Sequence, residues 1–266
     1  MKTNDGTLRG KSALVTGSTG GIGLAIARRL AMAGCDVMLH GIETQETVQK
    51  TVEVFQQQYG VNCAYVRADL QQQAEIAGLF SQLSSFGGGP DILVNNAVVR
   101  HFYPVESFPV EAWDKALAVN LSAAFHTIRL SLPHMRARGW GRVFNMTSVY
   151  SSRGATSRID YVTTKTALLG MTRAVALETL NQGITCNAIC PGSVSTPSID
   201  LRVQALMQEQ AVDQEEAIRR FLAGKQPIER LVDSAHVAEL LFFLCGEAAQ
   251  DITGAMLPVE GGWLAS

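Results

Sequence analysis

The chain has 266 residues, of which 47% are hydrophobic and 17% charged, and its formal net charge is −2 at pH 7. This balance excludes a disordered chain and gives no basic surface for nucleic acid or acidic lipid. The start of the chain is polar, without an apolar segment of signal-peptide type, and the densest apolar run, residues 240–245, is far too short to span a bilayer. Five cysteines at scattered positions indicate reduced thiols and show no metal-ligand spacing. We expect a cytoplasmic protein with no nucleic-acid or membrane partner and no metal site.

Short apolar runs alternate along the chain with longer helical patterns. The runs predict strands at residues 12–16, 36–39, 62–66, 91–94, 142–147, 185–190 and 256–259. Helical patterns lie between the first two strands and near residues 43–58, 72–85, 111–138, 160–181, 199–223 (two short helices) and 233–246. This alternation predicts an α/β fold with a parallel sheet covered on both faces. No repeat or linker divides the chain, so we expect one domain, residues 1–266, in which residues 193–223 form an insertion over a site.

A glycine-rich turn, residues 16–23 (TGSTGGIG), follows the first predicted strand and opens a helix. Glycines there allow a tight turn and let the backbone approach a pyrophosphate, which the positive helix N-terminus attracts. The spacing G-x-x-x-G-x-G differs from the commoner G-x-G-x-x-G, and a glycine turn can also serve packing alone. Its position between a strand and a helix favours nucleotide binding.

The type of cofactor depends on the end of the second strand, where an acid favours NAD and an arginine favours NADP. This chain has His40 followed by Gly41 and Ile42, and no Arg or Lys occurs in residues 17–23 or 37–49. A 2′-phosphate would therefore be poorly compensated, which favours NAD over NADP. Asp69, after the third strand, could accept a hydrogen bond from the adenine amino group or could cap the next helix.

Tyr161 and Lys165 are four residues apart, so they share one face of the helix predicted to begin near Asp160. A nearby ammonium stabilises a phenolate and lowers the tyrosine pKa from its usual value of about 10. Such a tyrosine can exchange a proton with an alcohol or carbonyl oxygen near neutral pH. Ser148, at the end of the fifth strand, could hold that oxygen. Taken alone, such a pair is more often an ordinary contact on a helix surface.

Two further stretches carry asparagines. Asn95 and Asn96 precede Ala97 directly after the fourth strand, at the edge where a cofactor would lie. Asn120 falls inside the long predicted helix, where asparagine is unfavourable. It could hold a water, bend the helix or form a structural polar pair.

With the glycine turn, Asn95–Ala97, Asn120, Ser148, Tyr161-x-x-x-Lys165 and the PGSVST segment (residues 191–196) in order, the chain resembles the short-chain dehydrogenase/reductase family over essentially its whole length. The resemblance implies a Rossmann-type, doubly wound sheet of about seven strands with a helical substrate lid. It also implies that Tyr161 is the acid/base and that Ser148 holds the substrate oxygen. Lys165 would bind the nicotinamide ribose and lower the tyrosine pKa, and Asn120 would anchor a proton-relay water.

The cofactor contacts that we expect on this basis form one set, in which Thr196 would contact the nicotinamide amide. They are Gly17, Thr19, Gly21, Ile22, Gly23, His40, Asp69, Leu70, Asn96, Ala97, Tyr161, Lys165, Pro191, Gly192, Val194 and Thr196. The chain departs from the family at Val98, where glycine usually follows Asn-Asn-Ala. A β-branched residue disfavours positive φ, so we expect a different loop path rather than lost binding.

The segments 120–135, 176–192 and 225–227 and the closing Gly-Gly-Trp resemble bacterial 3-hydroxybutyrate dehydrogenases, which are NAD-dependent tetramers. In those enzymes Gln, His and Lys side chains hold the substrate carboxylate. The corresponding positions here are Arg100, Tyr150, Arg158 and Arg202, whereas His101 and Trp263 are retained. Guanidinium groups bind planar oxyanions through two hydrogen bonds and are not equivalent to Lys or Gln.

We therefore expect an NAD-dependent, homotetrameric oxidoreductase that interconverts a secondary alcohol and a ketone on a small anionic hydroxy acid. The substrate would be more anionic or longer than 3-hydroxybutyrate, such as a dicarboxylate or a sulfonate. The residues expected to contact it are Arg100, Ser148, Tyr150, Arg158, Tyr161, Arg202 and Trp263. In the alternative for the arginines, some face solvent or pair with Asp160, Asp200 or Glu106. Alternative functions are a polyol or sugar dehydrogenase on the same scaffold and a dinucleotide-binding regulator without catalysis.

Overall fold

The computed structural model describes residues 6–266 and shows a seven-stranded sheet in the order β3-β2-β1-β4-β5-β6-β7. The first residues of the polar start, 1–5, lie outside the described part of the chain. All neighbouring strands pair in parallel. The strands are β1 (Ser12–Val15), β2 (Asp36–Gly41), β3 (Cys63–Arg67), β4 (Ile92–Asn95), β5 (Gly141–Met146), β6 (Ile184–Pro191) and β7 (Met256–Val259). The predicted parallel sheet is confirmed, with strand ends shifted by up to two residues.

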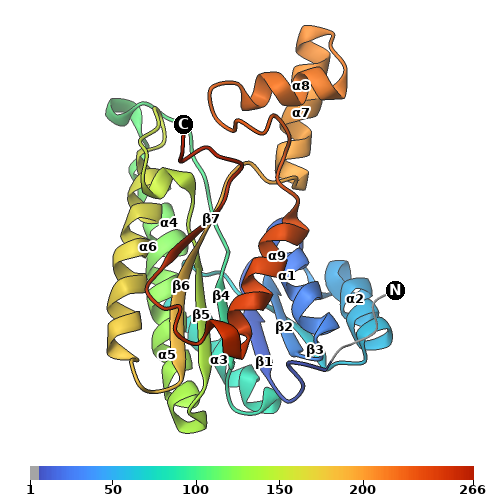
Figure 1. Cartoon of the computed structure of the whole chain (residues 1–266), viewed down its shortest axis with the longest axis vertical. Helices are drawn as coiled ribbons and strands as arrows, with labels where there is room; N and C mark the ends of the chain where they lie inside the picture. Colours follow the sequence, from blue (N-terminus) through green and yellow to red (C-terminus); the bar gives the residue numbers. More distant parts are fainter. Residues whose placement is uncertain (1–5) are drawn as a thin grey trace.

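Helices cover both faces of the sheet (Figure 1). One face carries α1 (Gly21–Met32), α2 (Gln45–Val54) and α9 (Ser234–Cys245), and the other carries α3 (Gln73–Gln82), α4 (Val110–Leu117), α5 (Ala123–Arg138) and α6 (Ile159–Glu178). Successive strand residues point to opposite faces, so Val15 packs in the core with α1 and α9 while Leu14 packs in the core with α5. Both cores are closed because a parallel sheet needs cover on each side.

Three of the predicted helices are interrupted or end in a different helical form. The helix predicted over residues 111–138 divides into α4 and α5 around a π-helical turn, Ala118–Ser122, which contains Asn120. Residues 43–58 form α2 and a second π-helical turn, Phe55–Tyr59, and α3 continues into a 3₁₀ turn, Leu83–Phe86. Further short 3₁₀ turns are Val105–Ser107, Val149–Ser151 and Glu247–Ala249. The prediction of one continuous helix around Asn120 was therefore wrong, and π-helical turns of this kind often accompany functional positions.

The carboxyl ends of the strands gather the loops that carry the predicted motifs. The glycine turn follows β1, residues 96–97 follow β4, and Ser148 lies just beyond β5. Because β2 and β3 lie on one side of β1 and β4 on the other, the loops after β1 and β4 diverge, and such a point forms a ligand crevice. The two predicted insertion helices, α7 (Pro197–Gln210) and α8 (Gln214–Leu222), project beyond this edge (Figure 1).

Two general expectations can be compared with residues 6–266. All five cysteines are unpaired and buried, in agreement with the reduced thiols predicted from their spacing. No helix in this part of the chain is long and apolar enough to cross a membrane.

Gly23 fixes how closely the first turn of α1 approaches the glycine turn. A Cβ atom at this position would lie 2.3 Å from the carbonyl oxygen of Gly17 and 2.5 Å from Nδ2 of Asn96. A real Cβ cannot approach backbone that closely. Helix α1 can therefore lie against the end of β1 only while residue 23 has no side chain.

We predict that Gly23→Ala lowers the free energy of unfolding by about 1–3 kcal/mol, the usual cost of overpacking. Gly20→Ala is the matched control, because a Cβ there would meet nothing within 4 Å and Gly20 has a φ of −160° that alanine adopts readily. Urea unfolding of both variants measures the difference. Equal stability of the two variants would contradict the packing role of Gly23.

Candidate active site

Two adjoining pockets lie at the carboxyl edge of the sheet. We call the one that contains Tyr161 the tyrosine pocket and the one over the glycine turn the glycine-turn pocket. Both pockets are lined by Ile22, Asn96, Val98, Arg100 and Thr196. A molecule that extends from one pocket into the other therefore passes these five residues, which form the boundary between the pockets.

The tyrosine pocket gathers most of the residues predicted to act on the substrate. Besides the shared residues, its lining includes Ser148, Tyr150, Arg158, Tyr161, Lys165, Pro191, Gly192, Val194, Arg202 and Trp263. They come from the segment after β5, the start of α6, the end of β6 and the loop after it, α7, and the last residues of the chain. Residues more than a hundred positions apart in the sequence therefore line the same pocket.

The glycine-turn pocket contains a second group of predicted residues. Gly17, Thr19, His40, Asp69, Leu70 and Ala97 line it together with the shared residues. Gly21, Gly23 and Asn120, also predicted as site residues, line neither pocket. Gly21 faces the Thr196 methyl group, which would lie 3.3 Å from an added Cβ, so Gly21 and Gly23 serve close packing.

Tyr161 and Lys165 lie in the first two turns of α6 and are buried, with 5% and 3% of their surfaces exposed. The ammonium of Lys165 lies 5.7 Å from the centre of the Tyr161 ring and donates to the carbonyl oxygen of Met146 at 2.6 Å. Ser148, held in extended conformation just after β5, hydrogen-bonds the Tyr161 side chain. The three predicted catalytic side chains therefore meet in one buried place.

Burial by itself would raise the pKa of Tyr161, because a phenolate loses its hydration. The positive charges of Arg100, Lys165 and Arg158 and the hydrogen bond from Ser148 outweigh this effect, and the pKa lies below its usual value. Burial also lowers the pKa of Lys165 to about 8, although Tyr161 opposes that shift. The direction for Tyr161 agrees with the sequence-based expectation, but the contribution of Arg100 exceeds that of Lys165.

The three predicted arginines stack on aromatic rings at the mouth of the tyrosine pocket. The guanidinium carbon of Arg158 lies 4.6 Å from the Tyr161 ring centre, that of Arg100 lies 5.3 Å from the same ring, and that of Arg202 lies 4.7 Å from Phe102. Nε of Arg158 is buried without a hydrogen-bond partner.

The alternative in which these arginines pair with nearby acids is not what the structure shows. In residues 6–266, none of the three forms an ion pair with Asp160, Asp200 or Glu106. Asp160 instead faces His101, and Asp200 accepts a long hydrogen bond from Ser195. The guanidinium groups therefore line the pocket without pairing with those carboxylates. Arg158 is half-buried, whereas Arg100 and Arg202 are exposed, in agreement with the part of the alternative in which some of these arginines face solvent.

A further cation, Lys225, lines the tyrosine pocket although the sequence did not indicate it as a site residue. It follows α8, and its pKa is lowered by burial and by the charges of Arg202 and Arg158. Among the described residues that line this pocket, none is Asp or Glu. No spacing rule links Lys225 to the arginines, since only the folded insertion brings it to them.

His40 has a structural role at the glycine turn. Its Nδ1 accepts from the backbone N–H of Gly17 at 3.1 Å, and its Nε2 lies 3.0 Å from the carbonyl oxygen of Ala68. Burial lowers the pKa of His40, in keeping with a neutral ring that accepts through one nitrogen and donates through the other. The ring therefore ties the glycine turn to the end of β3. His40 also lines the glycine-turn pocket, so its contact with the cofactor stays a prediction.

Three charged residues of the glycine-turn pocket were not predicted: Glu43, Arg67 and Lys115. Glu43 lies three residues beyond His40, and its carboxylate accepts from Thr19 Oγ1 at 2.9 Å and from the backbone N–H of Ile42 at 3.0 Å. Arg67, at the end of β3, donates to the carbonyl oxygen of Ile42 at 3.1 Å. The prediction of cofactor type considered the residues at the end of β2. Glu43 was missed because it lies beyond that strand, and Arg67 was missed because it lies on the neighbouring strand β3.

Asp69 lines the same pocket and accepts from the backbone N–H of Gln71 at 3.0 Å. Its alternative role as a helix cap is wrong, since α3 begins after Gln72. Its carboxylate still faces the glycine-turn pocket, so the proposed contact with an adenine amino group is compatible with its position.

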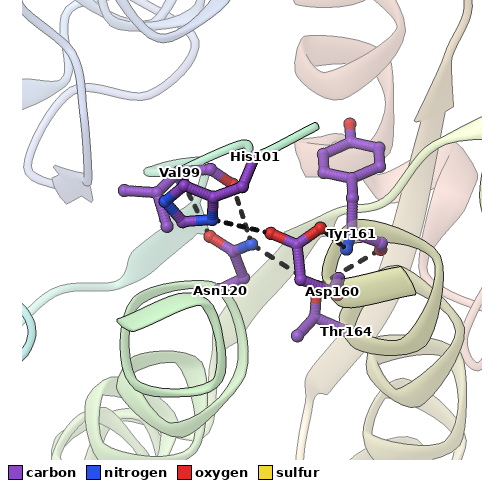
Figure 2. Close-up of polar contacts among 6 residues, drawn as sticks. All are labelled: Val99, His101, Asn120, Asp160, Tyr161 and Thr164. Atoms are coloured by element: carbon purple, nitrogen blue, oxygen red, sulfur yellow. Dashed lines mark hydrogen bonds and ion pairs between the residues drawn. The ribbon is translucent and has the colours of Figure 1, made fainter. Parts of the chain in front are cut away.

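The asparagines hold the loop after β4. Asn96 donates from Nδ2 to the carbonyl oxygens of Thr16 and Gly17, each at 2.9 Å. Asn120 accepts from the backbone N–H of Val99 at 2.8 Å and donates to its carbonyl oxygen at 3.0 Å (Figure 2). The Asn120 side chain thus holds the loop, and its expected role in anchoring a water stays a prediction. Val98 does not adopt a positive φ.

The glycine-turn pocket has the donor set of a dinucleotide site. Helix α1 begins at the pocket with no acidic residue in its first turn, so its positive end is not neutralised there. Gly17 has a φ of +61°, and a Cβ on it would lie 3.0 Å from Cα of Ala97. The turn therefore requires glycine and leaves its backbone open to a phosphate group.

Comparison with known proteins agrees with this geometry. A family model described as enoyl-(acyl carrier protein) reductase matches residues 17–264. A D-beta-hydroxybutyrate dehydrogenase of Cupriavidus necator is 41% identical over 97% of this chain and 99% of the relative, and one of Rhizobium meliloti is 38% identical over 96% and 99%. The structure of L-sorbose reductase from Gluconobacter frateurii, complexed with NADPH and L-sorbose, covers 98% of this chain and 99% of its own with a TM-score of 0.93 at 28% identity. The chain belongs to the short-chain dehydrogenase/reductase family and is an alcohol/ketone oxidoreductase with the family's NAD(P)-binding fold.

Proposed function

We propose that this protein interconverts a secondary alcohol and a ketone on a small anionic hydroxy or keto acid, with NAD as cofactor and Tyr161 as the acid/base. One observation carries the proposal: the tyrosine pocket joins Ser148, Tyr161 and Lys165 to a group of cations, and no described acid lines it. The groups proposed to react with the substrate and the cations proposed to bind it therefore line the same pocket. The two similar D-beta-hydroxybutyrate dehydrogenases bear names that fit such a substrate.

The proposed roles follow from the geometry of the buried side chains. When bound, NAD exchanges a hydride with the substrate carbon. Tyr161 gives a proton to the substrate oxygen in reduction and takes it in oxidation, and its lowered pKa favours this exchange near neutral pH. Ser148 donates to the same oxygen. Lys165, fixed by the carbonyl oxygen of Met146, stabilises the phenolate and would bind the nicotinamide ribose. Asn120 contributes by holding the loop after β4.

The substrate that we propose carries more negative charge than 3-hydroxybutyrate or is longer. Arg100, Arg158, Arg202 and Lys225 converge on the pocket. Arg158 and Lys225 are half-buried there, whereas Arg100 and Arg202 are exposed, so the cost of an unpaired charge applies mainly to the first two. A dicarboxylate or a sulfonate-bearing hydroxy acid would compensate them better than one carboxylate, and guanidinium forks bind both groups through paired hydrogen bonds. Tyr150 and Trp263, whose ring centres are 5.5 Å apart, would form the apolar wall.

The likeness to L-sorbose reductase favours a second candidate, a polyol or sugar dehydrogenase. A neutral sugar, however, would leave the cations of the tyrosine pocket unpaired. A regulator that only binds the dinucleotide would need neither a buried proton donor nor Ser148 beside it. The sugar dehydrogenase therefore leaves the cations of the pocket unexplained, and the regulator leaves the buried Tyr161 and Ser148 unexplained.

NAD rather than NADP is our proposal for the cofactor. Glu43 brings a carboxylate into the glycine-turn pocket, where it would repel a 2′-phosphate and could accept from a ribose hydroxyl. Arg67 and Lys115 also line this pocket, and their positive charges oppose this preference. Nε of Arg67 donates to the carbonyl oxygen of Ile42. A homotetramer and a cytoplasmic location, inferred from resemblance and composition, stay predictions.

Tyr161→Phe removes the proposed acid/base while keeping the ring. We predict that kcat for keto-acid reduction falls by at least about 100-fold, the usual contribution of a positioned acid or base, while the Kd for NADH stays unchanged. Steady-state assays and fluorescence titration with NADH measure the two quantities. Turnover close to that of the wild type would refute the assigned role. Wild-type protein that binds NADH but reduces no ketone would revive the regulator.

The anionic substrate is tested with a series of ketones that differ in their terminal group: acetoacetate, longer keto dicarboxylates, a keto sulfonate and a neutral ketose. We predict the highest kcat/KM for a member with a second or stronger anion. Arg158→Gln should raise KM for that ketone about tenfold, the loss of one charged hydrogen bond. Arg219→Gln, which removes a half-exposed guanidinium of α8, is the matched control. A much higher kcat/KM for acetoacetate than for every such analogue would overturn the proposal.

The cofactor preference is tested at Glu43. We predict that wild-type protein binds NADH more tightly than NADPH and that Glu43→Gln narrows the ratio about tenfold, because like charges a few ångströms apart repel by more than 1 kcal/mol at a protein surface. Glu46→Gln, a substitution of the acid in the first turn of α2, is the control. Tighter binding of NADPH by the wild type would count against NAD.

A further inference from the structure

The loop after β4 presents Arg100 to the tyrosine pocket while its neighbours on both sides are held elsewhere. We call residues 98–103 the arginine loop. Arg100 lines the pocket, and its guanidinium carbon lies 5.3 Å from the Tyr161 ring centre. The preceding residue, Val99, is held through its backbone by Asn120. The position of Arg100 therefore depends on what holds the other side of the loop.

That other side is held by an ion pair that lines neither pocket (Figure 2). Nδ1 of His101 lies 2.8 Å from Oδ2 of Asp160, whose side chain is completely buried. The second carboxylate oxygen, Oδ1, accepts from the backbone N–H of Tyr161 at 2.6 Å. Within residues 6–266, His101 provides the only side-chain donor to Asp160.

The His101–Asp160 pair links Arg100 to Tyr161, and the distance between these two residues affects the pKa of Tyr161. Arg100 immediately precedes His101, and Tyr161 immediately follows Asp160. Figure 2 shows the Tyr161 ring extending away from this cluster, while its backbone faces the carboxylate. The bond between His101 and Asp160 therefore fixes the arginine loop against the start of α6.

A weaker contact supports the same junction. The backbone N–H of Tyr103 donates to the carbonyl oxygen of Ser157 at 3.2 Å, one residue before Arg158. Thr164 links the other members of the cluster, since it donates to the carbonyl oxygen of Asp160 at 2.8 Å and lies 3.4 Å from Nδ2 of Asn120. Arg158 also stacks on the Phe102 ring across the junction, at 4.3 Å from its centre. Among the described residues, His101 and Asp160 form the side-chain hydrogen bond that joins the loop to α6.

Burial of a carboxylate destabilises the folded state unless the group is paired. The contacts of Asp160 must therefore offset the loss of hydration of its carboxylate. The mechanism proposed above uses neither Asp160 nor His101. Their shared effect is to set the distance between the Arg100 guanidinium and the Tyr161 ring, and the interaction of two charges depends steeply on distance inside a protein.

We propose that His101 and Asp160 are positioning residues that clamp Arg100 beside Tyr161, so that one arginine both binds the substrate anion and tunes the acid/base. The proposal rests on the proposed function of Tyr161. Because Arg100 stabilises the phenolate, release of the clamp moves the ionisation of Tyr161 to higher pH. In alcohol oxidation, which needs the phenolate, the rise of kcat/KM with pH then occurs at higher pH.

The test compares two substitutions of His101. His101→Asn keeps a donor where Nδ1 stands, and His101→Leu removes it. We expect His101→Leu to lower kcat/KM for the preferred keto acid about tenfold and to shift the pH profile of oxidation up by about one unit. His101→Asn should keep both quantities near the wild-type values, and NADH binding should be unchanged in both variants. The same loss in both variants without a shift of the profile would refute the clamp.

A double-mutant cycle shows whether the pair acts through Arg100. In an Arg100→Gln background, His101→Leu should have little further effect on the pH profile, because the charge that it displaces is already gone. An undiminished shift in that background would overturn the proposal. Asp91→Asn, which breaks the buried pair of Asp91 with Arg138 at the opposite edge of the sheet, is the control for general destabilisation and should leave the profile in place.

A readout without turnover separates this inference from the proposed function. Tyrosinate absorbance of each variant, minus that of the same variant with Tyr161→Phe, gives the ionisation of Tyr161 alone. If the wild type reduces no ketone, the proposed function fails, yet the clamp still predicts a higher midpoint in His101→Leu than in His101→Asn. Identical midpoints would refute the clamp whatever the substrate is.

Discussion

The burial of Tyr161 is the constraint on which the rest of the site depends. A phenol enclosed by protein resists ionisation, yet a proton exchanger must ionise near neutral pH. This conflict is resolved by positive charge, since Arg100, Lys165 and Arg158 together outweigh the effect of burial on its pKa. Of these cations, Lys165 is buried, Arg158 is half-buried and Arg100 is exposed, and no described residue that lines the pocket is an acid. The anionic substrate that we propose would supply the negative charge that the lining lacks.

The fold supplies that charge from several distant parts of the chain. A parallel sheet brings the ends of β1, β4, β5 and β6 to one edge, and each end contributes a loop to the two pockets. Lys165 comes from α6, which packs against β6, whereas Arg202 comes from α7 in the insertion and Lys225 follows α8. The reacting groups thus belong to the rigid body, and the groups that set substrate charge belong mainly to the loops and insertion, where sequence can vary without disturbing the sheet.

The sequence predicts local features well. The glycine turn, the parallel sheet and the pairing of Tyr161 with Lys165 depend on spacing within one segment or on simple alternation, and each is found where expected. The features that escape it depend on contacts between segments. The π-helical turn at Asn120 is held by the backbone of Val99, the neutral His40 is set by its burial, and Lys225 reaches the arginines only through the folded insertion. No periodicity in the chain records these contacts.

The dual position of Arg100 links substrate choice to reactivity. The residue lines both pockets and is the strongest of the charges that lower the pKa of Tyr161. If the substrate is an anion, as we propose, its pairing with Arg100 weakens the effect of Arg100 on the phenolate, and substrate binding and proton transfer then depend on each other. Lys165 and the hydrogen bond from Ser148 then carry more of the stabilisation. In such a site several groups stabilise the Tyr161 phenolate, because the substrate anion partly neutralises the charge of Arg100.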